Sequence, residues 1–473
     1  MKDIKTKRDI KQKVLNAVAK VMCKRLFSGL LIYSFFFLFS DFSFAKSVED
    51  EIEELKTRIA QLERQVSKRQ DKLEEQEVTT KEIKESFVKY TPGEGAQIQP
   101  AGLNISAGVT FVFQGTPNAN NASDGEDSIF DGSWSMDIEI EKEFDDWGLA
   151  FLHLETGQND TVEGELSLFS NVNRDADASG AAVNVTEAWY EHYFFNEQLT
   201  LTGGKIDATS YLDQNEYAND ERAQFLGHIF RNSPTIEWPS DNNLGARAYV
   251  CVEPIQFLEF ETGYFEADGD WDDIFDHAFY MAQVNLKLAD LLGYDPEQFG
   301  GNYRFYTWIN DRFHEKLVDE GGFATDDCKE MNYGFGISCD QMITDVFGIF
   351  GRYGWQRPDI MPVDAAAGTP PDIATIEYAW SSGIRISGKY WNRNDDILAF
   401  AIGQAFSGDE YDDAGGGGSA EGHIETYYSL KLNECLTVSP DFQVIWDPNG
   451  ISKPSEGDDD TIFVYGMRGQ IDF

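Results

Sequence analysis

The chain has 473 residues, and its 83 Asp and Glu outweigh 38 Lys and Arg to give a formal net charge of −45. This balance argues against a nucleic-acid partner, because phosphate binding needs clustered Lys and Arg. The length suits two or three soluble domains or one large β-barrel. A low mean hydropathy together with 14% aromatic residues favours a barrel, because only alternate side chains of a barrel strand face lipid.

Residues 1–45 are predicted to be a signal peptide. The first 25 residues carry nine Lys and Arg against two Asp, and an apolar run follows from Leu26 to Phe39. That run has the length of a signal-peptide core and is too short to span a membrane comfortably. Ser43-Phe44-Ala45 offers small residues for cleavage, which would take the net charge from −45 to −51. A membrane anchor is the alternative.

Residues 46–90 are predicted to form a periplasmic α-helical coiled coil. Apolar side chains keep a heptad between residues 48 and 77, and the residues between them are mostly Glu, Lys, Arg and Gln. Self-association is the favoured interpretation, and a single helix on the barrel or a solvated spacer is the alternative. The heptad residues are Ile52, Ile59, Val66 and Leu73 at one core position and Val48, Leu55 and Leu62 at the other.

Residues 91–473 are predicted to form an all-β transmembrane barrel. Apolar and polar side chains alternate from Leu103 to Phe113 and from Trp134 to Glu141, which is the period of a strand with one apolar face. Short turns alternate with long polar connections, as expected for periplasmic turns and outer loops. A strand with half of its connections takes about 23 residues, so about sixteen antiparallel strands are expected around an aqueous channel. A soluble two-domain β protein is the alternative. The long connections are predicted at Gly157–Ala182, Arg357–Ala374, Ser407–Gly422 and Pro448–Asp460.

The stretch from Gly203 to Pro239 begins as a strand and then stops alternating. Asp213 to Asn232 is too polar, and too rich in Asn, Asp and aromatic residues, to face lipid. A segment without the strand period inside a barrel sequence is predicted to fold into the lumen and narrow it. An ordinary outer loop is the alternative.

The last stretch, Thr461 to Phe473, alternates again. Phe463, Tyr465 and Met467 share one parity, and Arg468 lies on the other. The stretch fits the length of a transmembrane barrel strand. A final strand that ends in Phe resembles the C-terminal signature of bacterial outer-membrane barrels, so the barrel-assembly machinery is an expected partner.

Residue types that carry catalysis or hold metals give little signal. The six His form no H-E-x-x-H and no G-x-S-x-G occurs, so neither an enzyme nor a cofactor is expected. The closely spaced Asp residues from Asp268 to Asp273 resemble a calcium-binding loop, but the stretch lacks the glycine at loop position six and the terminal Glu of an EF-hand. We predict a solvated acidic loop and no metal site, with adventitious divalent cations as the alternative.

Four cysteines remain after the predicted cleavage site: Cys251, Cys328, Cys339 and Cys435. Four cysteines allow three pairings, and the sequence does not choose among them. Cys328 and Cys339 are spaced to close a short loop in an oxidising compartment. Four free thiols are the alternative.

Several short blocks are spread in order along the chain from Gly204 to Gly450. They are Gly204-Lys205-Ile206-Asp207, Asn219-Asp220-Glu221 with Gln224-Phe225, Asn232-Ser233-Pro234, Trp238-Pro239, Phe350 to Trp355, Arg393 to Asp396, Glu425 to Tyr428, Ser439 to Gln443 and Pro448-Asn449-Gly450. Together they resemble the carbohydrate-selective porins of the OprB type, over roughly residues 100–473. The resemblance implies a sixteen-stranded outer-membrane channel, often trimeric, that passes mono- and oligosaccharides by diffusion. The heptad segment and the very acidic balance depart from the simplest members of that family.

Strand parity predicts a row of arginines on the lumen side of the wall, formed by Arg247, Arg352, Arg385 and Arg468. An Arg fork of donors suits both vicinal hydroxyls and carboxylates. Opposed charges on the row and on the folded-in segment would set a transverse field at the narrowing; simple pairing of each Arg with wall carboxylates is the alternative. The further predicted constriction and solute-binding residues are Asp207, Asp213, Asp220, Glu221, Arg222, Arg231, Trp238, Glu425 and Asp441.

These patterns predict a multi-pass outer-membrane porin of a Gram-negative-type bacterium that passes small hydrophilic solutes, above all carbohydrates, by passive diffusion. A general cation-preferring porin and a coiled-coil tether between barrel and cell wall are the alternatives. Expected partners are outer-membrane lipid, the solutes, further copies in a homotrimer, and the cell wall through the coiled coil.

Overall fold

A computed structural model describes residues 88–98, 101–121, 128–175, 180–239, 243–318, 322–323, 330–361, 376–413, 419–450 and 461–473, with scattered positions between 52 and 70. The chain divides into two units, Met1–Lys84 and Glu85–Phe473. No helix in the described parts is long and apolar enough to cross a membrane.

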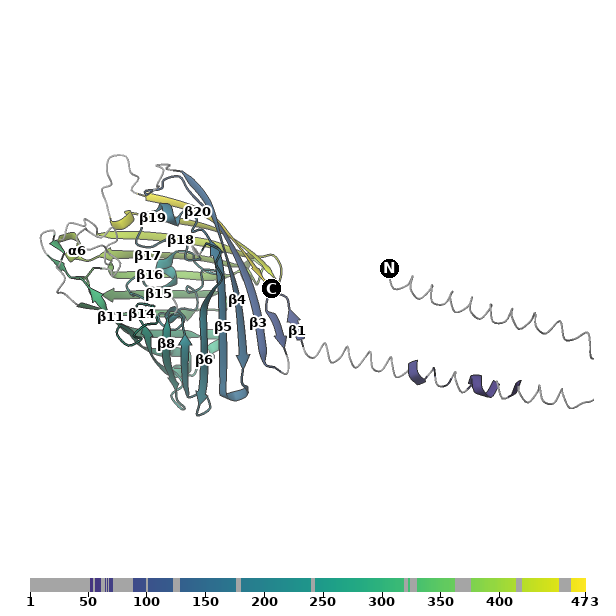
Figure 1. Ribbon diagram of the computed structural model, residues 1–473. Helices are drawn as coiled ribbons and strands as arrows, with labels where there is room; N and C mark the ends of the chain where they lie inside the picture. Colours follow the sequence, from purple (N-terminus) through teal and green to yellow (C-terminus); the bar gives the residue numbers. More distant parts are fainter. Residues whose placement is uncertain are drawn as a thin grey trace, which may run out of the picture. The chain divides into compact units, whose positions relative to one another are not determined.

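The second unit is a closed barrel of 16 antiparallel strands, as predicted (Figure 1). Each strand pairs with its neighbours in chain order, and β20 closes the ring by pairing with both β19 and β3. The wall strands are β3 (Leu103–Thr116), β4 (Ile129–Glu143), β5 (Gly148–Gln158), β6 (Asn184–Phe194), β7 (Leu199–Lys205), β8 (Leu244–Cys251), β9 (Leu258–Glu266), β10 (Ala278–Lys287), β11 (Gly301–His314), β14 (Glu330–Met342), β15 (Phe347–Gln356), β16 (Ile376–Ser387), β17 (Ile397–Ser407), β18 (Ala420–Lys431), β19 (Leu436–Trp446) and β20 (Thr461–Asp472).

An N-terminal hairpin completes the seam where the barrel closes. β1 (Val88–Thr91) pairs with β2 (Gly95–Ile98), and β2 pairs with β3 between Leu103 and Ile105. β20 covers only the other part of β3, from Gly108 to Gly115, so the hairpin covers the edge that β20 leaves. The predicted boundary after residue 90 therefore lies inside β1.

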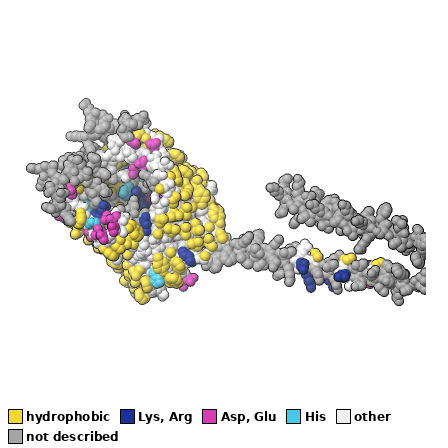
Figure 2. Space-filling model, in the orientation of Figure 1, with side chains coloured by type: hydrophobic (Ala, Val, Ile, Leu, Met, Phe, Trp, Pro, Cys, Tyr) yellow, Lys and Arg dark blue, Asp and Glu magenta, His cyan; other side chains and the backbone are white. Residues whose placement is uncertain are grey.

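Strand alternation places apolar side chains on the outer face. Phe400 on β17, Tyr353 on β15 and Phe335 on β14 are exposed. The residues directly before and after each of them on the same strand point inward and are buried. Figure 2 shows apolar side chains spread over the outer wall and charged side chains gathered around the hollow at one end. This is the pattern of a wall with lipid outside and polar groups inside.

Connections at one end of the barrel are short and those at the other end are long. The short ones include the single turn η1 (Asp145–Trp147) and η4 (Gly388–Trp391), while α4 (Leu288–Leu292) and α5 (Pro296–Phe299) make one longer connection at the same end. The long end carries β12 (Leu317–Val318), β13 (Gly322–Phe323) and α6 (Asp409–Asp413), together with the segments that enter the lumen.

The described positions between 52 and 70 of the predicted coiled coil are helical and exposed, among them Ile52, Ile59 and Val66, whereas its last three residues, 88–90, belong to β1. The rest of that segment and the predicted signal peptide lie outside the described residues. Self-association of the segment therefore stays a prediction.

The short disulfide loop between Cys328 and Cys339 is one of the pairings that the sequence allows. Cys339 is a free thiol on β14, and Cys328 lies outside the described residues. Cys251 and Cys435 are free thiols as well.

Candidate functional site

The segment predicted to enter the lumen does so. We call residues 206–239, between β7 and β8, the lumen insert. It contains the short helices η3 (Ala208–Ser210) and α3 (His228–Arg231). Its apolar side chains pack against the inner faces of β9 to β11 and of β15 to β18 rather than against lipid, and among them Leu212, Phe225 and Phe230 are fully buried.

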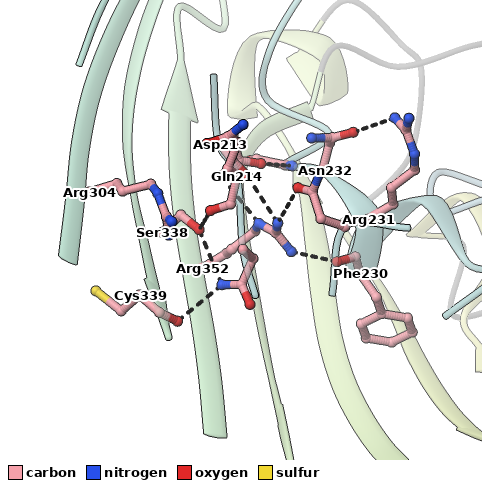
Figure 3. A network of polar contacts seen from close by, with 12 residues as sticks. Asp213, Gln214, Phe230, Arg231, Asn232, Arg304, Ser338, Cys339 and Arg352 are labelled. Carbon is pink, nitrogen blue, oxygen red and sulfur yellow. Dashed lines mark hydrogen bonds and ion pairs between the residues drawn. The ribbon is translucent and has the colours of Figure 1, made fainter. Parts of the chain in front are cut away.

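Arg352 on β15 holds the lumen insert against the barrel wall through hydrogen bonds (Figure 3). Its Nε donates to Asp213 Oδ1 at 3.2 Å, and its Nη2 donates to the Asp213 carbonyl at 2.9 Å and to Asn219 Oδ1 at 3.2 Å. Its Nη1 donates to the carbonyl of Phe230. The side chains of Arg352 and Asp213 are 1% and 0% exposed, so this arginine is buried beneath the insert and does not line open water.

Two more wall residues hold the insert backbone. Arg468 on β20 donates from Nη1 to the carbonyls of Glu221 and Gln224, both at 2.6 Å. Glu425 on β18 accepts from the backbone N–H groups of Leu226 at 2.7 Å and Gly227 at 2.8 Å. Side chains of the wall thus satisfy buried backbone donors and acceptors that would otherwise be costly to bury.

Inward-facing glycines on β15 leave room for this docking. A Cβ on Gly354 would collide with the hydroxyl oxygens of Ser233 and Thr235, and one on Gly348 would collide with the ring of Tyr217. The insert therefore approaches the wall closely where side chains are missing.

A second segment also enters the lumen, although the sequence predicted it as an outer loop. Residues 159–175, which we call the second lumen loop, follow β5 and include η2 (Glu163–Glu165). Glu421 on β18 accepts from the backbone N–H groups of Phe169 at 2.8 Å and Ser170 at 2.9 Å. The backbone N–H of Arg174 donates to the Leu226 carbonyl at 2.8 Å and joins this loop to the insert.

A cavity of about 1070 Å³ lies between the insert and the inner face of β4 to β7. Nine carboxylate and four Lys or Arg side chains line it, together with the rings of Phe151 and Trp238. The carboxylates are those of Asp137, Glu139, Glu141, Glu155, Asp175, Glu187, Asp207, Asp220 and Glu221, and the basic residues are Arg174, Lys205, Arg222 and Arg231.

Opposite charges meet across this cavity. Arg222 of the insert lies 3.5 Å from Asp137 Oδ2 and 3.4 Å from Glu139 Oε1 on β4, and its side chain stays 36% exposed. Arg231 pairs with Glu221, and its Nη1 donates to Asn232 Oδ1 at 2.7 Å. The insert thus brings Arg222, together with Asp220 and Glu221, against the carboxylates of the wall, and a transverse field at this place stays a prediction.

The predicted arginine row lies on the lumen face but does not form one surface. Arg352 and Arg468 are buried under the insert, while Arg385 lies 6.0 Å from the ring of Tyr217. Arg247 lines a separate chamber of about 240 Å³ bounded by β8 to β11, where it pairs with Glu191 and Glu261.

Some of the remaining predicted site residues border the cavity, and others are buried in the barrel wall. Asp207, Asp220 and Trp238 border the cavity, whereas Asp441 is buried on β19, where its Oδ1 accepts from Gln443 at 2.9 Å. Asp207 also caps η3, because its carboxylate accepts from the backbone N–H of Thr209 at 2.8 Å.

Sequence reasoning left the carboxylate row of β4 out of the candidate site. Asp137 and Glu139 lie on the polar face of the strand predicted from Trp134 to Glu141. The signal that could have placed them in the site is their regular spacing in a wall that faces Arg222 and Arg231 of the insert. His153 on β5 was missed as well; its Nε2 is 2.9 Å from Asp137 Oδ1, and its Nδ1 is 2.7 Å from Thr186 Oγ1.

Burial changes the charge of the lumen segments. Burial and the nearby Glu221 raise the pKa of Asp175 well above its ordinary value, and burial raises the pKa of Glu163 to about 7. Burial and the positive charge of Arg174 lower the pKa of His228 to about 3. At neutral pH the lumen is therefore less negative than a count of its carboxylates implies.

A family model described as the carbohydrate-selective porin, OprB family, matches residues 130–473. The chain belongs to this family. It is an outer-membrane porin with a closed barrel.

One solved porin structure shares this fold with a TM-score above 0.5. The chain is similar to Pseudomonas putida OprB in its high-pH structure, with a TM-score of 0.61 and 14% identity over 79% of this chain and 94% of that chain. At that identity the likeness shows the fold alone. The outer-membrane channel DcaP of Acinetobacter baumannii aligns with a TM-score of 0.47 and 8% identity, over 80% of this chain and 99% of that chain. No curated protein sequence matches the porin.

Proposed function

We propose that this porin passes small carbohydrates by passive diffusion through the cavity between the lumen insert and β4 to β7. The observation that carries the proposal is the lining of that cavity, where Arg222 faces Asp137 and Glu139 and the rings of Phe151 and Trp238 border the same space. Sugars are neutral solutes with many hydroxyl groups, which both donate and accept hydrogen bonds. Paired carboxylates and guanidinium groups supply acceptors and donors side by side, and aromatic rings supply apolar faces.

Binding must stay weak for such a channel to conduct. The cavity offers fixed polar groups at its walls, and the pairing of Arg222 with two carboxylates competes with the solute for each of them. Solutes are therefore expected to exchange quickly rather than to be trapped, which is the condition for flux through a binding site.

The proposal is tested by ion currents through the purified porin in planar bilayers. Addition of mono- and disaccharides should reduce the open-channel current in a saturable way, and liposomes that contain the porin should swell in the same sugars. A current insensitive to every sugar at concentrations where small uncharged polyols still enter liposomes would contradict carbohydrate preference.

A cation preference is a second candidate, favoured by the excess of nine carboxylates over four basic groups around the cavity. The reversal potential in a salt gradient measures it directly. Cation selectivity without sugar block would assign a general porin, whereas both together would assign a sugar channel with a negatively charged lining.

We retain three further proposals about the ends and the assembly of the chain. Residues 1–45 direct export, residues 46–90 self-associate in the periplasm and contact the cell wall, and the barrel forms a homotrimer. The heptad of apolar residues and the helical state of the described positions such as Lys56 and Ile59 support the second of these. A peptide of residues 46–90 should then gain helicity with concentration, because short isolated helices are marginal in water.

A further inference from the structure

The loop between β9 and β10 gathers acidic side chains at the long-loop end of the barrel. Ligand atoms of Glu266, Asp268 and Asp270 all lie within 4.8 Å of one another. Asp268 also forms such a group with Asp276 and His277. Clustering of this kind is common on exposed acidic loops and shows nothing by itself.

The buried state of the Glu266 carboxylate is the second observation. Glu266 is 0% exposed, and its Oε2 has no hydrogen-bond partner; the buried Oδ1 of Asp268 has none either. Glu266 uses only Oε1, which accepts from the backbone N–H of Trp271 at 2.9 Å. A buried carboxylate oxygen without a donor is strongly unfavourable unless a cation or a proton reaches it.

No Lys or Arg side chain supplies that cation in the described parts of the barrel, where no ion pair joins Lys or Arg to Glu266, Asp268 or Asp270. The ring of His277 lies near Asp268 and Asp276, and its Nδ1 is 4.0 Å from Asp311. Three carboxylates thus lie close together without a Lys or Arg partner among the residues that the structure describes.

We propose that this loop binds a divalent cation of the Ca²⁺ type through Glu266, Asp268 and Asp270. Calcium takes carboxylate oxygens at about 2.3–2.6 Å, so two ligands on opposite sides of the ion are at most about 5 Å apart. The spacing of the three carboxylates fits that limit without rearrangement. Water and loop carbonyls complete the coordination.

The loop backbone explains how one short segment brings these groups together. Gly269 lies between two of the ligands with a φ of +75°, and Trp271 follows the third with a φ of +59°. A left-handed residue lets the backbone turn sharply, so a short segment can return close to itself. The site differs from an EF-hand because a strand end, rather than a helix, supplies Glu266.

Terbium luminescence tests the site in the full-length porin in detergent, because Tb³⁺ binds oxygen ligands and takes up excitation energy from a nearby indole such as Trp271. We expect saturable Tb³⁺ emission that Ca²⁺ reverses. Glu266→Gln and Asp268→Asn should each weaken Ca²⁺ competition at least tenfold. Asp272→Asn, which removes the same charge from the same loop outside the ligand set, should change it less than twofold.

Other outcomes would overturn the proposal. They are no saturable emission, an equal loss in Asp272→Asn, or displacement of Tb³⁺ by Zn²⁺ but not by Ca²⁺, which would assign the softer set that contains His277. Every variant is checked for heat-modifiable barrel mobility. If Glu266→Gln does not assemble, exposed Asp270 carries the test as Asp270→Asn, together with the rate of chymotrypsin cleavage after Phe275, which Ca²⁺ should slow in the unaltered porin only.

Discussion

At the scale of single residues, Arg222 is the cation that most directly neutralises the cavity. It faces Asp137 and Glu139 and keeps contact with water. Arg222→Ala should leave the barrel assembled, widen the cavity and leave two carboxylates without a partner. Single-channel conductance should rise and the reversal potential should shift toward stronger cation selectivity. Lys389→Ala is the control. It removes a basic group from the short turn η4, outside the cavity lining, and should change neither quantity.

Arg352 has a structural role that its lumen-facing parity did not reveal. Arg352→Ala would leave Asp213 buried without its partner, and such a loss costs about 3–5 kcal/mol. We expect a lower unfolding temperature and faster proteolysis of the lumen insert. The double variant Arg352→Ala with Asp213→Ala should recover part of the loss, because the unpaired charge is gone. Equal stability of the single and double variants would contradict this role.

At the scale of elements, β15 and the lumen insert are in close contact, and we expect this contact to narrow the channel. Gly354→Leu would collide with Ser233 and Thr235 and should push the insert away from the wall. We predict a changed conductance and weaker sugar block in a barrel that still assembles. Gly351→Leu is the matched control on the same strand, since a Cβ there meets nothing closer than 3.9 Å. Identical currents from the two variants would show that the insert does not set the pore.

The elements also show what the sequence could and could not predict. Alternation placed Phe111 and Phe113 outward and Arg352 inward, because each strand has two faces and only one can meet lipid. Alternation does not say what fills the lumen, so Arg352 and Arg468 were expected beside water although the insert covers them. The second lumen loop was predicted as an outer loop because its polar sequence hides the contacts of Glu421 with Phe169 and Ser170, which join positions about 250 residues apart.

At the scale of the whole molecule, neighbouring residues of β4 distinguish its lipid face from its lumen face. Ile138→Arg places a charge on the apolar outer wall, which costs about 2–4 kcal/mol near the bilayer centre. It should reduce the amount of heat-modifiable barrel in the outer membrane. Glu139→Arg introduces the same side chain one position along, inside the cavity. That variant should assemble and shift ion selectivity toward anions; equal assembly defects in both would contradict the assigned faces.

The central claim is that solutes pass between the lumen insert and β4 to β7. The most direct measurement is single-channel current during treatment with a charged thiol reagent, in a variant whose native cysteines are replaced by serine. Thr186 lies on the wall of the cavity, whereas Ser381 lies on β16 with a buried side chain. Each is replaced by cysteine in turn. The reagent should reduce the current through Thr186→Cys by more than half and leave the current through Ser381→Cys unchanged. Block of Ser381→Cys with no effect on Thr186→Cys would contradict the account.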